Sequence, residues 1–324
     1  MRYRLFTYLF PILLLLGCGQ EEVKVLKLAH GLDVNHSVHK AMVKMGEDLE
    51  RISGGKMTVE VYPSQQLGTE RECLELLQIG SLDMTKVSVG VMENFAPKMK
   101  VLGLPFIFRD RQHSFDVLDS EIGQQLLDGG RQYWLKGLAY YDAGSRSFYT
   151  KQKPIESPSD LEGMKIRVME SVTAMDMVRS LGGSPTPISW GELYTSLQQG
   201  VVDGAENNPP SFYLSRHYEV CKYYALDEHT TLPDVLVMGT QTWDILSEQE
   251  QKWLKEAVDL SVVYQRKLWA ESEKEALDAV IEAGVEVIRP SKEEFMEKVD
   301  GIYGEYRESE PELYKIIQQI RNTK

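Results

Sequence analysis

The feature that most constrains the fold is a regular alternation of strand and helix patterns after residue 22. Three short apolar stretches have the length and pattern of strands, and two helical stretches separate them. The predicted strands cover 23–29, 57–61 and 82–89, and the predicted helices cover about 36–52 and the residues after Thr69. Strands joined through helices lie parallel in one sheet, linked by right-handed crossovers. The sequence therefore predicts an α/β fold that starts from a parallel sheet.

Apolar spacing in this region predicts which side chains enter the core. We expect Val23, Val25 and Leu28 to point inward from the first strand. In the helix that follows, apolar residues recur at alternating spacings of four and three, which is typical of an amphipathic helix. These helical residues are Val38, Met42, Met45, Leu49 and Ile52. Gly54-Gly55 ends this helix, and Thr69 with Glu72 forms a capping box that opens the next one.

A second α/β unit follows the first. Its predicted elements are strands at 136–141 and 164–169, a helix at 172–181, and later apolar strands at 235–238 and 285–288. The two units share the pattern L-Q-x-G-x-x-D, at 77–83 and at 197–203. About 300 residues beyond the N-terminal segment suit two domains of ordinary size. We therefore expect two similarly wound α/β lobes.

Residues 188–213 predict a helix, a tight turn, a buried strand and a polar loop. Ser189 with Glu192 has the spacing of a capping box, so the helix is expected to begin at Trp190 and to stop at Gly200. Val201-Val202 then starts the predicted strand. Glu206, Asn207 and Asn208 follow, and Pro209-Pro210 stiffens the loop. Polar side chains at the carboxyl end of a strand are where open α/β sheets bind ligands.

A long helix is predicted near the C-terminal third of the chain. Ser247 with Glu250 forms another capping box, and neither Gly nor Pro follows until Gly284. At ~1.5 Å per residue, this helix would exceed roughly 50 Å. Its apolar residues keep spacings of three and four, so we expect a helix that braces the two lobes. The residues of this predicted apolar face are Trp253, Ala257, Leu260, Tyr264 and Leu268. Ser291 with Glu294 has the same cap spacing before the last helices.

The N-terminal segment indicates export. Arg2 and Arg4 precede Leu5–Leu16, which is apolar except for Thr7. The stretch is shorter than the ~20 residues that span a bilayer, and is typical of a signal peptide. It ends in Leu-Leu-Gly-Cys18, which resembles the lipobox of bacterial lipoproteins. That resemblance implies a signal peptide at 1–17, a lipid on Cys18 that anchors the protein to a membrane leaflet, and a tether at 18–22. A plain secretory signal is the alternative.

Charge and motif content narrow the function. The net charge of −13 argues against nucleic acid as a partner, although a local arginine pair can still bind a small anion. His30, His36 and His39 complete no recognised ligand set, so we expect no metal, and no motif implies a cofactor. Cys73 and Cys221 are expected to be unpaired, buried thiols. Because no nucleophile motif is present, we expect no enzyme.

Two arginines and an asparagine are the strongest binding candidates. Arg167 lies in the predicted strand Lys165–Val168, on the face opposite to Ile166, and Arg146 follows the junction at Gly144. A guanidinium can bind a carboxylate through two parallel hydrogen bonds, best from a rigid strand. Asn207 offers a donor and an acceptor. The alternative from local sequence is that both arginines lie on solvated faces.

Several motifs together resemble the DctP-type substrate-binding proteins of TRAP transporters. They are LAHGLDVNHSVHKA, SQQLGTERECLELLQIGSLDM, LPFIF, LEGMKIRVME and ELYTSLQQGVVDGAENNP, in the order of that family and over nearly the whole mature chain. The resemblance implies a periplasmic, two-lobe α/β protein with mixed sheets flanked by helices and a long hinge-spanning helix. It also implies two integral membrane permease subunits as partners, and we expect a monomer.

The resemblance also implies site residues and lobe boundaries. Arg167 would bind the ligand carboxylate, with Arg146 as the second arginine and Asn207 beside them. From the first lobe, Glu70 and His36 are candidates for hydrogen bonds to ligand hydroxyls. Lobe I is expected at 23–144 plus about 232–265, and lobe II at 145–231 plus about 266–324. Trp190 would form a wall of the pocket.

Substrate identity follows less directly. Receptors with T-E-R-E after Q-L-G and an E-N-N-P-P run resemble those that take hexuronates or related sugar acids. If these side chains face the cleft, Glu70 would repel a second carboxylate, whereas Lys86 would favour a more negative ligand. C4-dicarboxylates and 2-oxo acids stay open as substrates. Two further classes of protein stay open, namely a ligand sensor and a lipid-anchored hydrolase or lyase that uses Asp203 with Glu206 or the histidines.

Overall fold

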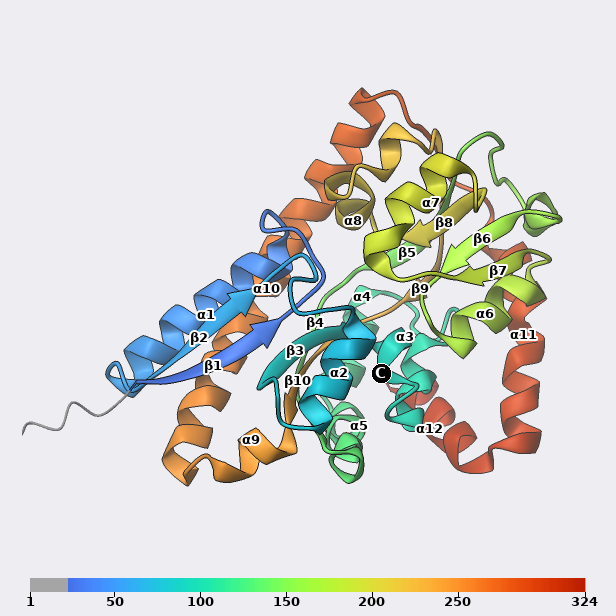
Figure 1. Ribbon diagram of the computed structural model, residues 1–324. Coiled ribbons are helices and arrows are strands. Elements are labelled where there is room, and N and C mark those ends of the chain that lie inside the picture. Colours follow the sequence, from blue (N-terminus) through green and yellow to red (C-terminus); the bar gives the residue numbers. More distant parts are fainter. Residues whose placement is uncertain (1–22, 324) are drawn as a thin grey trace, which may run out of the picture.

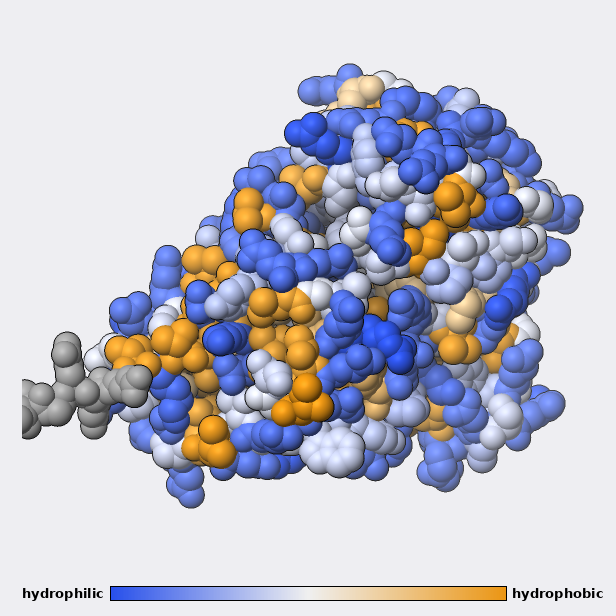
Figure 2. Space-filling view, viewed as in Figure 1, coloured by the Kyte–Doolittle hydropathy of each residue, from blue (hydrophilic) through white to orange (hydrophobic). Residues whose placement is uncertain are grey.

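The computed structural model describes residues 23–323, so the predicted signal peptide, the tether and Cys18 lie outside the described residues. The chain forms two mixed β-sheets, each flanked by helices (Figure 1). We call the five-stranded sheet with α1 and α2 lobe I, and the six-stranded sheet with α6, α7 and α8 lobe II. In the view of Figure 2, most of the hydrophobic surface lies over β1, β2, β3 and α2 of lobe I.

Lobe I has the strand order β2-β1-β3-β10-β4. Its strands are β1 (Lys24–Ala29), β2 (Met57–Tyr62), β3 (Met84–Ser88), β10 (Asp234–Gly239) and β4 (Leu135–Tyr141). β1 pairs parallel with β2 and β3, which confirms the predicted parallel start, and α1 (Ser37–Ser53) and α2 (Glu70–Gln78) are the connecting helices. β10 arrives from far along the chain and pairs antiparallel with both β3 and β4. That late strand makes the sheet mixed.

Lobe II has the order β11-β9-β5-β8-β6-β7. Its strands are β5 (Ser145–Thr150), β6 (Lys165–Val168), β7 (Ser184–Pro187), β8 (Gly204–Asn207), β9 (Tyr223–Thr231) and β11 (Glu286–Ile288). β6 pairs parallel with β7 and β8, whereas β5 pairs antiparallel with β8 and β9.

The remaining helices lie around these sheets. The α-helices are α3 (Val89–Met92), α4 (Arg111–Leu118), α5 (Glu121–Gly129), α6 (Val172–Ser180), α7 (Leu193–Gln199), α8 (Pro209–Leu214), α9 (Thr240–Ile245), α10 (Glu248–Glu282), α11 (Lys292–Ser309) and α12 (Pro311–Asn322). The 3₁₀ turns are η1 (Pro97–Gly103), η2 (Gly130–Tyr133), η3 (Pro158–Leu161), η4 (Trp190–Glu192) and η5 (His217–Glu219). α12 packs back against α5 and η1.

The sequence echo between the two units corresponds to equivalent structure. Gly80 and Gly200 both adopt φ of +73° at the end of a helix, where glycine avoids the strain that a Cβ would bring. Asp83 accepts the backbone N–H of Lys27 at 2.8 Å, and Asp203 accepts that of Lys165 at 2.8 Å. Each aspartate thus binds the backbone of the neighbouring parallel strand, so the two lobes share the same local arrangement of helix, turn and strand.

The long helix α10 has 35 residues and connects the lobes, in contact with α1 and β4 of lobe I and α8 of lobe II (Figure 1). The predicted capping box at Ser247 forms. The predicted apolar face is wrong in part, because Leu260 and Tyr264 are exposed. Ser261 and Gln265 are buried instead.

The reason is hydrogen bonding at the junction of the lobes. Ser261 bonds the Tyr141 hydroxyl at 2.7 Å, and Gln265 bonds both the N–H and the carbonyl of Asp142. Counting apolar residues cannot find a buried face that is polar. The residues of α10 that are buried are Leu254, Ala257, Val258, Ser261, Gln265, Trp269, Ala276 and Val280.

One hydrophobic core of lobe I lies between its sheet and α1, and a second packs on the other face of the sheet with Leu74 and Leu77 of α2. Leu26 and Leu28 pack with the buried face of α1, which contains Val38, Met42, Met45 and Leu49 as predicted. Val23 and Val25, however, are both 46% exposed, so the inward orientation predicted for them is wrong. The face of β1 toward the helices is the one with Leu26 and Leu28, and it is the opposite face that carries Val25.

Two predictions for residues 188–213 fail. The Ser189 side chain makes no cap hydrogen bond, and the segment begins as the 3₁₀ turn η4 before α7. Val201-Val202 precedes the strand, which is Gly204–Asn207, so Glu206 and Asn207 belong to β8 and not to a loop. Asn208 caps α8, which starts with the two prolines.

The predictions for Ser291 and for the two cysteines have different outcomes. The Ser291 side chain precedes α11 as expected but makes no cap hydrogen bond. Cys73 and Cys221 are buried and unpaired, which confirms the prediction.

Gly144 lies between β4 and β5, where the chain passes from one sheet to the other, and it has φ of +58°. A Cβ there would lie 2.9 Å from Trp269 Nε1 and 2.7 Å from Glu273 Oε1. We expect Gly144→Ala to lower the free energy of unfolding by at least about 2 kcal/mol, from backbone strain and crowding together. Urea denaturation measures this.

The matched control is Gly163→Ala, because Gly163 has φ of +77° and a Cβ added there would meet nothing within 4 Å. It should cost about 1 kcal/mol from backbone strain alone. Equal losses for both variants would show that the indole and carboxylate do not crowd Gly144.

Candidate functional site

A pocket of about 790 Å³, including its mouth, lies between the two sheets. All six predicted site residues line it, namely His36 and Glu70 from lobe I and Arg146, Arg167, Trp190 and Asn207 from lobe II. The other lining residues are Gly31, Leu32, Gln65, Thr69, Arg71, Lys86, Ser88, Val91, Ala143, Met169, Glu170, Ile188, Ser189, Asn208, Ser211, Leu232, Asp234 and Trp269. The fold therefore brings together side chains that lie far apart in the sequence.

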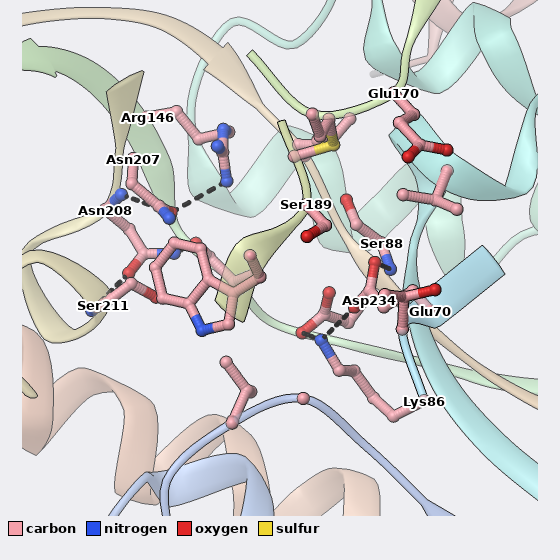
Figure 3. A pocket seen from close by; sticks show the side chains of 18 of the residues that line it. Glu70, Lys86, Ser88, Arg146, Glu170, Ser189, Asn207, Asn208, Ser211 and Asp234 are labelled. Atoms are coloured by element: carbon pink, nitrogen blue, oxygen red, sulfur yellow. Dashed lines mark hydrogen bonds and ion pairs between the residues drawn. The ribbon is translucent and has the colours of Figure 1, made fainter. Parts of the chain in front are cut away.

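Arg146 reaches the pocket from β5 and is neutralised from β8. Its guanidinium donates to Glu206 Oε1 at 2.8 Å and to Asn207 Oδ1 at 2.8 Å, the second of which is seen in Figure 3. Arg146 is only 6% exposed. Because burial excludes water, the ion pair holds both groups in place. The alternative that Arg146 lies on a solvated face is excluded.

His229 and Asp227 continue the buried network of charges beyond the Arg146–Glu206 ion pair. His229 Nδ1 lies 2.8 Å from Asp227 Oδ2, and its Nε2 lies 3.6 Å from Glu206 Oε2. Burial alone would lower the pKa of His229, but Asp227 and Glu206 outweigh it and raise the pKa to about 9. Burial alone would raise the pKa of Glu206, but Arg146 and His229 lower it to about 2. His229, Glu206 and Arg146 are therefore all charged at neutral pH.

Arg167 differs from Arg146 in having no ion-pair partner among the described residues. Its Nε and Nη2 donate to the backbone carbonyl of Ile188 at 2.9 and 2.7 Å. Within residues 23–323, no carboxylate forms an ion pair with its guanidinium, although the residue is only 2% exposed. Burial lowers its pKa below the usual range. Its solvated-face alternative is also excluded, and an uncompensated buried cation favours an anionic ligand.

Trp190 packs against this cation. The guanidinium carbon of Arg167 lies 5.8 Å from the centre of the indole ring. The opposite lobe approaches the same segment, because Gln65 and Gly31 lie close to Gly191 and Trp190. Trp190 is thus both a wall of the pocket and a point where the lobes meet.

Lobe I contributes an ion cluster. Lys86 Nζ lies 3.0 Å from Glu70 Oε1 and 3.2 Å from Asp234 Oδ2 (Figure 3). Glu70 Oε2 also accepts the backbone N–H of Ser88 at 3.2 Å. Lys86 therefore faces the pocket but is already paired with two carboxylates. Its charge does not favour a more negative ligand.

His36 supplies a neutral donor. Its Nδ1 accepts the backbone N–H of Val38, so the proton of the neutral ring lies on Nε2. Burial, and then the charge of Lys86, lower the pKa of His36 to about 3. Its buried Nε2 has no hydrogen-bond partner within the part of the chain that the structure describes. Such a donor suits a ligand oxygen.

Sequence reasoning missed Asp234 and Trp269 as lining residues. Asp234 begins β10, so its place beside Lys86 depends on a pairing across about 150 residues of chain that no local pattern reveals. An aspartate before the apolar stretch 235–238 is the available signal. Trp269 lies on the same buried face of α10 as Ser261 and Gln265. Because those two residues are polar, the spacing of apolar residues does not identify this face as buried.

The enzyme alternative loses its acid/base pair. The Asp203 carboxylate accepts the backbone N–H of Lys165, and Glu206 is bound to Arg146. Over residues 23–323, there is no cluster of three histidine, cysteine or acidic side chains that could hold a metal ion. In the same residues, every helix is too short or too polar to cross a bilayer.

Comparison with known families identifies the chain. The family model of bacterial extracellular solute-binding proteins, family 7 (DctP), matches residues 28–309. The chain belongs to this family. It is a TRAP-type solute receptor, from a family of transport proteins and not of enzymes. The predicted family and two-lobe fold are thus confirmed.

Related proteins support the same assignment. A solute-binding protein of Chromohalobacter salexigens is 34% identical over 284 residues, 87% of this chain and 84% of that protein. A TRAP periplasmic solute-binding protein of Bradyrhizobium sp. BTAi1, solved with α/β-D-galacturonate, is 41% identical with a TM-score of 0.90, covering 93% of this chain and 100% of that one. One from Roseobacter denitrificans, solved with β-D-glucuronate, is 35% identical with a TM-score of 0.90 and the same coverage.

The buried charge network of lobe II predicts a pH dependence of stability. Because the pKa of His229 is about 9 in the folded protein and about 6.5 when unfolded, its charge stabilises the fold fully below pH ~6.5. That contribution is lost as the pH rises through about 9. We expect the free energy of unfolding of the wild type to fall between about pH 6.5 and 9.5 relative to that of His229→Gln, measured by urea denaturation. Parallel curves for the two proteins would contradict the charged state of His229.

Proposed function

We propose that this receptor captures a hexuronate or a related sugar acid between its lobes and delivers it to a membrane permease. The observation that carries the proposal is the guanidinium of Arg167, which is buried in the pocket without a carboxylate partner among the described residues. A ligand carboxylate supplies the missing negative charge. Charge-assisted hydrogen bonds to a guanidinium are about twice as strong as neutral ones.

The ligand would bind with its two ends in different lobes. Its carboxylate lies against Arg167, with Arg146 and Asn207 of the same lobe beside it. Its hydroxyls reach Glu70 as acceptor and the Nε2–H of His36 as donor, while Trp190 covers a face of the sugar. A sugar acid has this combination of one charge and several hydroxyls, and a ligand without hydroxyls would leave these buried groups unpaired.

Related receptors support this choice of substrate. Structures similar to this chain were solved with galacturonate and with glucuronate, at 41% and 35% identity. A C4-dicarboxylate-binding protein of Bacillus subtilis is 28% identical. We therefore favour a hexuronate over a C4-dicarboxylate or a 2-oxo acid.

Capture would work by closure of the lobes. We propose lobe boundaries at 23–144 plus about 232–265 for lobe I, and 145–231 plus about 266–324 for lobe II. The ligand contacts both lobes only in the closed form, so it stabilises that form by its differential affinity. The closed receptor would then dock, as a monomer, on two integral membrane subunits of a TRAP permease. A lipid on Cys18 would hold it near them.

The proposal predicts that Arg167→Met abolishes hexuronate binding without unfolding the protein. Loss of the charge should raise the Kd for D-galacturonate at least about 30-fold, since truncating one partner of a buried charge pair costs ~2–5 kcal/mol. The free energy of unfolding of the unliganded protein should change by no more than about 1 kcal/mol, because an apolar side chain of similar length replaces an uncompensated buried cation. Titration calorimetry and urea denaturation measure the two effects.

The control is Arg179→Met, at an exposed arginine of α6 that pairs with Asp176 at 2.7 Å. It should bind as the wild type does. An unchanged affinity of Arg167→Met for D-galacturonate would contradict the proposal. A wild type that binds no hexuronate would also contradict it.

A further inference from the structure

Lobe I contributes to the pocket a cluster of three charged side chains that bind one another. We call Glu70, Lys86 and Asp234 the lobe I triad. The lysine lies between the two carboxylates (Figure 3), with Nζ–O distances of 3.0 Å to Glu70 and 3.2 Å to Asp234. One positive and two negative charges leave the triad itself net negative when all three groups are ionised, although burial raises the pKa of Asp234. Arg71, the other lobe I cation that lines the pocket, pairs with Glu75 at 3.2 Å. All three side chains line the pocket.

The triad is fixed and mostly dry. The side chains of Lys86 and Asp234 are 4% and 9% exposed, and that of Glu70 is 18% exposed. The Ser88 N–H holds the second oxygen of Glu70. An ammonium has three N–H donors, so two carboxylate partners leave one donor of Lys86 for a ligand. The carboxylates keep free lone pairs. A hydroxyl group, which both donates and accepts, matches this set.

Lobe II carries the opposite polarity at equivalent positions. In lobe I, Lys86 follows Asp83 by three residues on β3. In lobe II, Glu206 follows Asp203 by three residues on β8. The two aspartates make the same 2.8 Å bond to the neighbouring parallel strand, so the two positions correspond.

The ion-pair partners correspond as well. Asp234 lies on β10, opposite Ser88, and reaches Lys86 from the antiparallel neighbour of β3. Arg146 lies on β5, next to Ser147, and reaches Glu206 from the antiparallel neighbour of β8. Where lobe II presents an arginine to the pocket, lobe I therefore presents a carboxylate.

We propose that the lobe I triad is a specificity device that admits a monocarboxylate with hydroxyls at its far end and rejects a dicarboxylate of the same carbon number. The inference rests on the proposed function, because it takes the first carboxylate to lie at Arg167. A second carboxylate would then meet Glu70 and Asp234 in a water-poor site, where like charges repel strongly. Lys86 gives it little help, since two carboxylates already neutralise the ammonium. Specificity of this kind uses repulsion of the wrong ligand.

The test compares D-galacturonate with galactarate, the six-carbon acid that has a second carboxylate in place of the aldehyde. Titration calorimetry at about pH 8 measures both Kd values for the wild type, Glu70→Gln and Asp234→Asn. The wild type should prefer galacturonate by at least about 100-fold. Each variant removes one negative charge and should narrow that preference by about tenfold or more. The ring of galacturonate also differs from the open chain of galactarate, so the decisive readout is the change in the ratio.

The control is Asp244→Asn, a carboxylate on the lobe I surface that pairs with Arg131 at 2.9 Å. It changes the net charge equally and should leave the ratio unchanged. Thermal melting confirms that each variant is folded, and the more exposed Glu70 carries the test if Asp234→Asn does not fold.

The outcomes separate the two proposals. A wild type that binds neither acid refutes the proposed function and this inference with it. A wild type that binds galacturonate but takes galactarate equally well refutes only the inference. The same holds if folded Glu70→Gln and Asp234→Asn keep the wild-type ratio. A ratio narrowed by tighter binding of galactarate in these variants, and not in Asp244→Asn, supports the triad as the device that excludes a second carboxylate. A ratio narrowed only by weaker binding of galacturonate refutes the inference.

Discussion

The proposed binding mode depends on one buried cation that has no ion-pair partner among the described residues, the guanidinium of Arg167. Its strand β6 fixes its position, and the carbonyl of Ile188 accepts two of its N–H groups, but no carboxylate of the described residues completes the charge. A charge in that state disfavours the fold and is best relieved by an anion from outside. In the proposed binding mode, part of the ligand affinity would come from pairing this charge, and closure of the second lobe over the ligand would shield the pair from water.

The two lobes have the same local backbone arrangement at the site, but the charges of the equivalent side chains are opposite. In lobe II the pair is Arg146 with Glu206, and in lobe I it is Asp234 with Lys86. With Arg167 added, the named groups of lobe II are net positive, and with Glu70 added, the lobe I triad is net negative. A monoanion that carries hydroxyls at the other end complements both walls. The negative net charge of the whole protein does not prevent anion binding, because the local field is set by these few buried groups.

The sequence predicts those features that depend on neighbours along the chain. The capping boxes at Thr69 and Ser247 form, the buried face of α1 is right, and the arginine of the strand Lys165–Val168 lines the pocket. The failures share a cause. The Ser189 side chain makes no cap hydrogen bond in a segment that meets the other lobe, and Gln265 is buried where it bonds a backbone group of the junction. Tertiary contacts of that kind, like the approach of Asp234 to Lys86, leave no local pattern to read.

Binding as proposed requires that lobe II holds one carboxylate while lobe I holds hydroxyls. The most direct measurement is a crystal structure of the mature receptor with D-galacturonate. We predict the ligand carboxylate within hydrogen-bond distance of the Arg167 guanidinium and sugar hydroxyls against Glu70 and His36. A carboxylate bound at Lys86, or a sugar bound outside the pocket, would contradict this arrangement.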